Sequence, residues 1–280
     1  MYSQKIKQNP LVLKMANLLY RQVIPSRTES YVFVATTGRS GSNTLANLFT
    51  AVPDSICLHE PHPVLYNPDD PRRISESYFR SQFLLKSVYV RRTGRKFRYY
   101  IETNHQFIKH FSEFSVLEFN NKLKVIHLVR DPVSTAISFY RIGSIPGKTV
   151  IGKRYLLDPK SEDNLVNADI LFKNDDFNHD FFRCLWYWYE TEFRIQKFIK
   201  DHPHIPIFKI RTIELNDLPK VKRMLDYLEM DYDLASLEKL VGRRDNQKSD
   251  KNYNSIERTR AEEMNEDLLD SLPSLRSVLN

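Results

Sequence analysis

The residues best suited to do chemistry in this 280-residue chain lie in one loop, which reads Gly-Arg-Ser-Gly-Ser-Asn-Thr over residues 38–44. The apolar run at 31–35 predicts a buried strand before the loop, and apolar residues at helical spacing follow it. Gly38 and Gly41 permit backbone angles that aim successive amide N–H groups at one point, and the helix adds unpaired donors. Arg39 adds one positive charge, and Ser42, Asn43 and Thr44 add neutral hydrogen-bond donors. The loop therefore predicts a site for a phosphate or sulfate oxyanion.

The spacing of the glycines disfavours an ordinary ATP-binding P-loop. A Walker A motif has four residues between its glycines and a lysine before the hydroxyl residue. Here two residues separate Gly38 from Gly41, and no lysine follows. The loop therefore has neither a lysine to reach the γ-phosphate nor a hydroxyl to bind magnesium at the positions that the motif requires. Considered alone, the loop would also suit a plain glycine turn between a strand and a helix.

A second segment of the same kind occupies residues 124–141, KVIHLVRDPVSTAISFYR. Its apolar strand ends at Arg130, Asp131 is a natural N-cap, and Pro132 suits the first turn of a helix. Ser138 lies eight residues after Arg130. Because ligands of parallel sheets bind outside the carboxyl ends of the strands, Arg130 and the first loop can face one ligand. Alone, Arg130 would equally suit a salt bridge, and Ser138 an ordinary helical position.

Together the two segments resemble the sulfotransferases that use 3′-phosphoadenosine 5′-phosphosulfate (PAPS). In that family a loop of Lys or Arg, Ser, Gly and two hydroxyl residues binds the 5′-phosphosulfate. This chain has Arg39-Ser40-Gly41-Ser42-Asn43 there, with Asn43 in place of a hydroxyl residue. The family's second motif, Arg-Asp-Pro with a serine eight residues after the arginine, binds the 3′-phosphate and corresponds to Arg130 and Ser138. The resemblance implies PAPS as cofactor, the desulfated nucleotide PAP as product, and these residues as ligands.

The resemblance also implies the fold, which is the P-loop-like sulfotransferase fold: an α/β sandwich of three layers with a mainly parallel central sheet. The length and the 41% hydrophobic content suffice for a single sulfotransferase domain over 1–280. Within it we expect a helical extension over 1–30, an irregular acceptor-binding lid over 142–180, and a surface helix within 256–280.

Sulfuryl transfer sets two chemical demands. Negative charge develops on the 5′-phosphate as the sulfuryl group leaves, so catalysis needs fixed donors and a cation there, and Arg39 is the candidate. The acceptor, a hydroxyl or an amine, attacks the sulfur in line and must lose a proton, which requires a general base within hydrogen-bond reach. No metal is needed for this chemistry.

The leading candidate for the base is Glu60, in Leu-His-Glu-Pro-His-Pro after a predicted strand at 55–58. Carbohydrate-type sulfotransferases have a similar apolar residue and Glu-Pro after the first helix, which implies that Glu60 is the base or orients the acceptor. His59 and His62 are alternatives. Two histidines beside an acid would also suit a metal, but the chain has two cysteines and no HExxH or paired CxxC motif, so we expect no metal site.

A second candidate lies after the predicted strand at 99–101, where Glu-Thr-Asn-His occupies residues 102–105. Small-molecule sulfotransferases have Lys-Thr-His at a comparable strand end, with the histidine as base. His105 is displaced by one residue from that place, so it ranks second to Glu60. Glu102 would equally be a charge partner for a nearby arginine.

The net charge of +7 would suit nucleic acid, an anionic membrane or an anionic small ligand. No RRM or KH signature is present, and PAPS is itself polyanionic, so we expect no nucleic-acid partner. In the family a late basic loop covers the 3′-phosphate. By that resemblance Arg243, and with it Lys248, would contact the cofactor, although the usual Lys-Gly-x-x-Gly pattern is missing.

The apolar run at 11–19 is too short to span a membrane and is interrupted by Lys14 and Asn17, so it predicts an amphipathic helix packed on the domain. We therefore expect a cytoplasmic enzyme. Two other functions stay open: an atypical nucleotide or small-molecule kinase, which would require ATP and magnesium, and a non-catalytic nucleotide- or RNA-binding protein. The sequence leaves the acceptor and the oligomeric state open.

Overall fold

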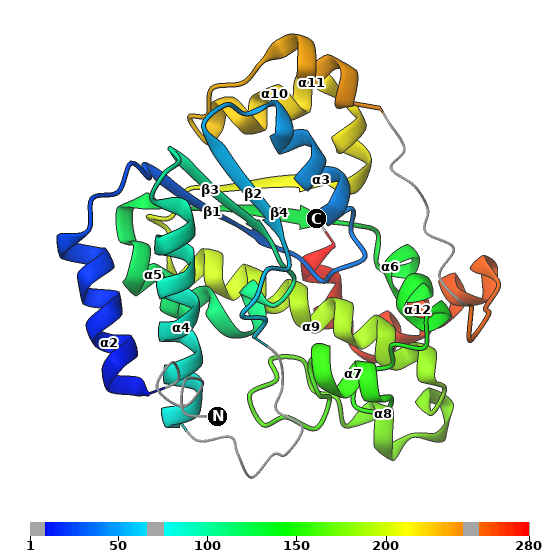
Figure 1. Ribbon diagram of the computed structural model, residues 1–280. Helices are drawn as coiled ribbons and strands as arrows, with labels where there is room; N and C mark the ends of the chain where they lie inside the picture. Colours follow the sequence, from blue (N-terminus) through cyan, green and yellow to red (C-terminus); the bar gives the residue numbers. More distant parts are fainter. Residues whose placement is uncertain (1–8, 66–75, 243–251, 280) are drawn as a thin grey trace.

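The computed structural model of the chain describes residues 9–65, 76–242 and 252–279. A central sheet of five strands runs through the molecule, with helices on both faces (Figure 1). The strands are β1 (Ser30–Ala35), β2 (Ser55–His59), β3 (Tyr99–Thr103), β4 (Leu123–Val129) and β5 (Ile207–Arg211). Their order is β2-β3-β1-β4-β5, and each neighbouring pair is parallel. The carboxyl ends of all five strands therefore lie at one edge of the sheet.

Sequence pattern alone predicts the bounds of only a few helices, and the structure supplies the rest. In the described residues the α-helices are α2 (Pro10–Leu18), α3 (Ser42–Leu48), α4 (Glu76–Gly94), α5 (Ser112–Phe119), α6 (Pro132–Arg141), α7 (Val150–Tyr155), α8 (Ile170–Lys173), α9 (Asp180–Asp201), α10 (Leu218–Tyr227), α11 (Leu234–Leu240) and α12 (Arg258–Ser271). A π-helical turn, η4 (Phe107–Phe111), follows β3, and a 3-10 turn, η7 (Thr212–Asn216), follows β5.

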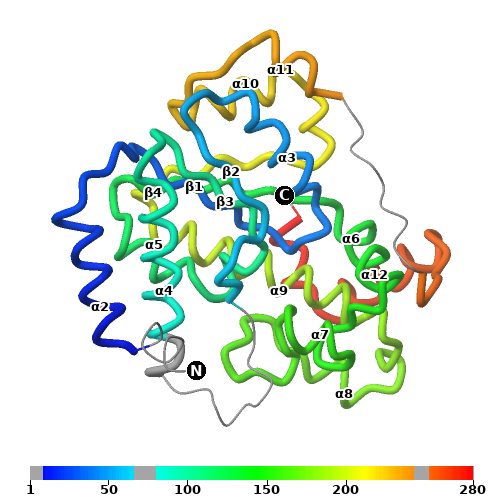
Figure 2. The backbone as a smooth tube through the Cα atoms, in the orientation of Figure 1, coloured from blue at the N-terminus to red at the C-terminus, as the bar shows by residue number. Residues whose placement is uncertain are grey.

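Alternate side chains of β1 enter two different apolar cores, because successive residues of a strand point to opposite faces. Val32 and Val34 pack with α3, α10 and α11 on one face. Tyr31 and Phe33 pack with residues of α4, α5 and α9 on the other. Figures 1 and 2 show α3 beside α10 and α11, although α3 is far from these two helices in the sequence. The predicted α/β sandwich of three layers with a parallel central sheet is confirmed.

The segment 142–180 is more regular than its sequence suggested. It contains α7 and α8, and it buries apolar side chains such as Leu156, Leu171 and Phe177 in a third core shared with α6, α9 and α12. Outside these helices and a short 3-10 turn the segment is irregular, as expected, and its apolar residues pack it against the body of the protein. Its role as an acceptor-binding lid, and the organisation of the chain as a single domain, stay predictions.

Both ends of the described chain are helical, as expected. In α2, Leu13 and Asn17 are buried, and the Asn17 amide donates to the Glu118 carboxylate of α5. The helix α12 is more than a surface helix, since Met264 and Leu268 are buried in the core with α6 and α9. The 19-residue helix α4 was not anticipated, because its aromatic and cationic residues give it little apolar periodicity.

Candidate active site

The predicted site residues follow the carboxyl ends of neighbouring strands. The loop 38–44 follows β1, Glu60 follows β2, His105 follows β3 and Arg130 follows β4. The chain can be followed in Figure 2 from β1 through the loop into α3. Because the strands are parallel, these residues share one edge of the sheet, which is where ligands of such sheets bind.

The loop after β1 has the backbone that its glycines predict. Gly38 and Gly41 have φ angles of +85° and +87°, and Gly41 is the N-cap of α3. A Cβ atom at Gly41 would lie 3.1 Å from Cγ2 of Thr212, so there is little room for a side chain. Arg39 also has a positive φ, of 57°, which is uncommon for a residue other than glycine and costs about 1–2 kcal/mol. Strain of this kind is typical of functional loops.

The Ser40 hydroxyl stabilises the conformation of this loop. Ser40 is buried, its Oγ donates to the Gly38 carbonyl at 3.0 Å, and it lies 2.9 Å from Oγ1 of Thr37. The Thr212 hydroxyl donates to the Ser40 carbonyl at 2.7 Å and ties the loop to the end of β5. Ser40 therefore offers a ligand its backbone N–H, whereas Asn43 is exposed and Ser42 and Thr44 are partly exposed.

The two sequence motifs meet through their arginines. Nε of Arg39 donates to Oγ of Ser138 at 2.9 Å, and Nη1 of Arg130 donates to the Arg39 carbonyl at 2.8 Å. Burial, and then the nearby charge of Arg39, lower the pKa of Arg130. Two guanidinium groups close together create a positive potential that favours an anion. The structure thus brings Arg39, Arg130 and Ser138 together.

The helix that carries Ser138 begins as its sequence predicts. The Asp131 side chain caps α6 by accepting from the Ser134 N–H at 2.7 Å, and Pro132 occupies the first turn. The Trp188 indole N–H of α9 donates to the Arg130 carbonyl at 2.9 Å. Arg130 is therefore fixed through its backbone, which leaves its guanidinium at the edge of the sheet.

Glu60 and His105, the two candidate bases, lie against each other. Oε1 of Glu60 is 3.5 Å from Nε2 of His105. Glu60 has a φ of 46°, and its N–H donates to the Thr103 carbonyl at 3.2 Å, which joins the ends of β2 and β3. A Cβ atom on Gly38 would lie 3.3 Å from Cβ of His105, so the histidine also touches the oxyanion loop. The candidate base is therefore adjacent to the candidate anion site.

The other candidate residues near Glu60 make different contacts. Nδ1 of His59 lies 2.9 Å from the Thr103 hydroxyl, and His62 is exposed. Glu102 is a charge partner, but of a lysine instead of an arginine: its Oε1 lies 2.7 Å from Nζ of Lys86, and both side chains are 2% exposed. Lys86 also donates to the Pro61 carbonyl at 3.3 Å, so this ion pair braces the chain just after Glu60.

The sequence reasoning missed one titratable residue of the site, Lys109. Its Nζ lies 2.7 Å from Nδ1 of His105, and burial lowers its pKa well below the usual range. The available signal was a lysine within the apolar run Phe-Ile-Lys-His-Phe, four residues after a candidate base. The predicted cofactor ligand Arg243, and Lys248, lie outside the described residues.

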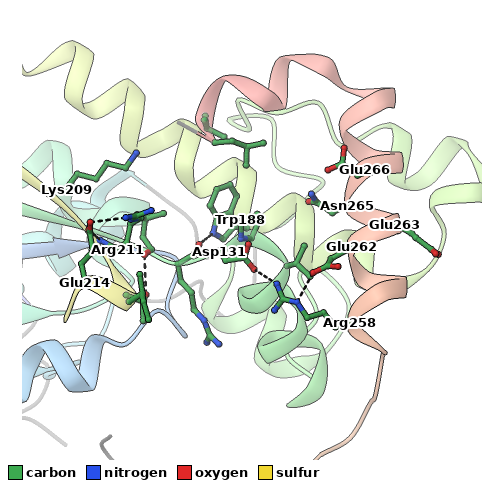
Figure 3. Close-up of a pocket in the computed structure, with 18 of the residues that line it drawn as sticks. Asp131, Trp188, Lys209, Arg211, Glu214, Arg258, Glu262, Glu263, Asn265 and Glu266 are labelled. Atoms are coloured by element: carbon green, nitrogen blue, oxygen red, sulfur yellow. Dashed lines mark hydrogen bonds and ion pairs between the residues drawn. The ribbon is translucent and has the colours of Figure 1, made fainter. Parts of the chain in front are cut away.

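A cleft of about 1490 Å³ opens beside Arg130, between the end of β5 and α12 (Figure 3). Lys209 and Arg211 lie on one side of it, and Glu262 and Glu266 of α12 on the other. Its described lining includes Arg130 but neither the 38–44 loop nor Glu60. The cleft therefore adjoins Arg130, and the candidate base lies away from it.

Fold and site indicate the class of protein: an α/β protein whose motifs at the carboxyl edge of a parallel sheet suit an oxyanion. The sulfotransferase domain family matches residues 29–268, which is most of the chain. The chain belongs to that family, as its motifs predicted, and its general reaction is sulfuryl transfer.

Several solved structures are similar to the chain at low sequence identity. A sulfotransferase domain from the curacin biosynthetic pathway is 16% identical, with 83% of each chain covered and a TM-score of 0.48. A sulfotransferase from Alicyclobacillus acidocaldarius is 15% identical over 89% of this chain and 95% of that one, with a TM-score of 0.48. A mouse sulfotransferase complexed with PAP is 13% identical over 95% and 92%, with a TM-score of 0.45. No curated protein matches the sequence.

Two further features of the described residues bear on cofactors and location. Within 9–65, 76–242 and 252–279, no three His, Cys, Asp or Glu side chains gather in a way that could hold a metal ion. No helix in these ranges is both long enough and apolar enough to cross a bilayer. The expectations of a metal-independent reaction and of a cytoplasmic enzyme stay predictions.

Proposed function

We propose that this protein is a PAPS-dependent sulfotransferase that moves the sulfuryl group to a hydroxyl or amine of a small-molecule or carbohydrate acceptor. The observation that carries the proposal is the meeting of the two motifs, in which Arg39 contacts Ser138 and Arg130 contacts the Arg39 backbone. PAPS has a 5′-phosphosulfate and a 3′-phosphate, so it needs two neighbouring anion sites. The loop with Arg39 suits the first, and Arg130 with Ser138 suits the second.

The residues of the site fit the charge of this donor. The backbone amides of the loop and the Arg39 guanidinium would stabilise the negative charge that grows on the 5′-phosphate as its bond to sulfur breaks. Polar side chains at the start of α3 add further donors: Ser42, Asn43 and Thr44. Arg243 remains a proposed ligand of the 3′-phosphate by resemblance alone.

The acceptor would attack the sulfur in line with the bond that breaks. A new bond forms between sulfur and the acceptor oxygen or nitrogen, the electron pair of the old bond goes to the 5′-phosphate, and the acceptor proton goes to the base. We propose Glu60 as that base, with His105 beside it as the alternative, because the pair adjoins the oxyanion loop at Gly38. The segment 142–180 is the proposed acceptor side.

The proposal is tested first by calorimetry with PAP, with adenosine 5′-phosphosulfate, and with ATP and magnesium. We expect the wild type to prefer PAP, and Arg130→Ala to weaken PAP binding by about 10- to 100-fold, since each hydrogen bond to a charged group contributes about 1.5–3 kcal/mol. Binding of adenosine 5′-phosphosulfate, which has no 3′-phosphate, should change much less.

The matched control is Arg141→Ala, which removes the same charge from an exposed position at the far end of α6. It should leave PAP binding unchanged. A preference for ATP with magnesium would instead favour the kinase, and binding of RNA that weakens steeply with salt would favour a nucleic-acid protein. If PAP binds, transfer of ³⁵S from labelled PAPS to alcohols, amines and saccharides would identify the acceptor class.

A further inference from the structure

Lys109 is a buried amine placed directly behind His105. It lies in the π-helical turn η4, a local irregularity that is frequent at functional sites, and its side chain points inward. Three polar atoms surround Nζ: Nδ1 of His105 at 2.7 Å, the Tyr155 carbonyl at 2.6 Å and the Tyr187 hydroxyl at 3.1 Å. These contacts come from three different parts of the chain.

The donors and acceptors of this cluster can be assigned one by one. The Tyr187 hydroxyl donates to the Thr37 carbonyl at 2.8 Å, so its oxygen accepts from Lys109. The Tyr155 carbonyl can only accept. In its charged form Lys109 has three N–H donors and no acceptor, so below its pKa the third N–H goes to Nδ1 of His105. Every polar atom around Nζ is then satisfied.

This assignment determines the ring proton of His105. Burial, and then the charge of Lys109, hold the pKa of His105 well below its usual range, so the ring is neutral and has one N–H. Because Nδ1 accepts from Lys109, that proton is on Nε2, the nitrogen 3.5 Å from Oε1 of Glu60. The Gln106 amide has two N–H donors, of which one goes to the Tyr155 carbonyl at 3.0 Å. The same nitrogen lies 3.4 Å from Nε2 of His105, a longer contact than the 2.7 Å between Lys109 and Nδ1, so the lysine contact determines the tautomer.

We propose that Lys109 is a positioning residue that holds His105 as the Nε2–H tautomer and so aims a ring N–H at the Glu60 carboxylate. The proposal rests on the proposed function, in which Glu60 takes the acceptor proton. A carboxylate has lone pairs on two oxygens, so Glu60 can accept from His105 and still take a proton. The same amine joins the strand before the oxyanion loop, through Tyr187 and Thr37, to the acceptor side at Tyr155.

The arrangement has a defined pH dependence. Burial lowers the pKa of Lys109, the charge of Glu60 acts in the opposite direction, and the charge of Arg194 lowers it further. His110 and His59 also face His105. As the pH rises through the pKa of Lys109, the neutral amine becomes able to accept from Nδ1, so the Nε2–H tautomer loses its preference. This change should come at a lower pH than an ordinary lysine would titrate.

The test is nitrogen-15 NMR of the His105 ring, in the wild type and in Lys109→Met, with and without PAP. We expect the wild type to show the Nε2–H tautomer below the pKa of Lys109 and a mixture with Nδ1–H above it, and Lys109→Met to show a mixture without this pH-dependent change. Tyr187→Phe is the matched control, because it removes a neighbour of Lys109 but leaves the contact with Nδ1. It should keep the Nε2–H tautomer.

A His105 ring that stays Nδ1–H throughout a pH titration of the wild type would overturn the proposal even if Lys109→Met failed to fold. Unchanged ring shifts in a folded Lys109→Met protein would overturn it as well, and PAP calorimetry on that variant reports whether the donor side is intact. The outcome is independent of the proposed base, since the tautomer is read without turnover. If Glu60→Gln kept full activity while the wild type showed Nε2–H, the choice of Glu60 as base would fail and the tautomer assignment would stand.

Discussion

The proposed anion side and the proposed base side of this site are held by different means. On the anion side, Arg39 is exposed and Arg130 half-buried, and hydrogen bonds to their backbone carbonyls hold the two residues in place. On the base side, the Glu60 carboxylate contacts Nε2 of His105, and Nδ1 of His105 contacts the buried Lys109 amine. The difference indicates that an oxyanion site needs fixed positive charge and donors at its edge, whereas a base needs partners that limit its orientation and its protonation state.

The largest effect should come from removing the proposed base. Glu60→Gln keeps the size and the contact with His105 but cannot take a proton at neutral pH, so we expect kcat to fall by about 10²- to 10⁴-fold. Because the change lies on the base side, the Kd for PAP should stay within about twofold, since no contact with the proposed nucleotide ligands is lost. Single-turnover transfer from labelled PAPS measures the first quantity and calorimetry the second.

Glu238→Gln, at an exposed position of α11, is the control for loss of one acidic charge. Parallel losses of PAP binding and of kcat in Glu60→Gln would mean that the two sides are not separable. Unchanged kcat would remove Glu60 from the mechanism and make His105 the leading base.

The anion side could be predicted from sequence because each of its motifs is continuous. The loop 38–44 and the Arg130–Ser138 segment each contain a strand end, a turn and a helix start, so local spacing alone predicts their shape. Only the parallel pairing of β1 with β4 was needed to bring them together.

The base side could be predicted only in pieces. Glu60 and His105 were identified singly, but their contact depends on the register of β2 against β3, which no local pattern specifies. Lys109 was missed, because a lysine among apolar residues has no motif and its partners come from distant segments. The Lys86–Glu102 ion pair was missed because α4 itself lacks a clear apolar periodicity.

Alanine substitutions at the two glycines of the loop can distinguish effects on the anion side from effects on the base side. Alanine at either position would have a φ near +85°, which costs an L-residue about 1–2 kcal/mol. The added Cβ would meet His105 from Gly38 and Thr212 from Gly41. We therefore expect both variants to weaken PAP binding by about 5- to 30-fold, and Gly38→Ala alone to lower kcat as well. Calorimetry and saturating-substrate kinetics measure the two effects.

Gly242→Ala has the same kind of backbone strain, since its φ is +82° and no atom of the described residues lies within 4 Å of the added Cβ. Because Gly242 precedes Arg243, the proposed 3′-phosphate ligand, we expect this variant to affect PAP binding at most and to leave kcat at saturating PAPS unchanged. Equal losses of kcat in Gly38→Ala and Gly41→Ala would contradict the division of the loop into an anion side and a base side.

The smallest effect should come from Ser138→Ala, which removes one neutral hydroxyl from the anion side. Its Oγ accepts from Arg39 at 2.9 Å. Because this contact is exposed and water can replace the lost hydroxyl, we expect the cost of a typical hydrogen bond, about 0.5–1.5 kcal/mol, instead of the larger cost of a buried charged one. We expect the Kd for PAP to rise by about 3- to 10-fold and the Kd for adenosine 5′-phosphosulfate to change less, because Ser138 serves the 3′-phosphate in the proposed arrangement. An equal rise for both ligands would mean that Ser138 acts by orienting Arg39 toward the 5′-phosphosulfate. Ser134→Ala on the same helix, whose hydroxyl accepts from Arg258 instead, is the control that should leave both constants near the wild-type values.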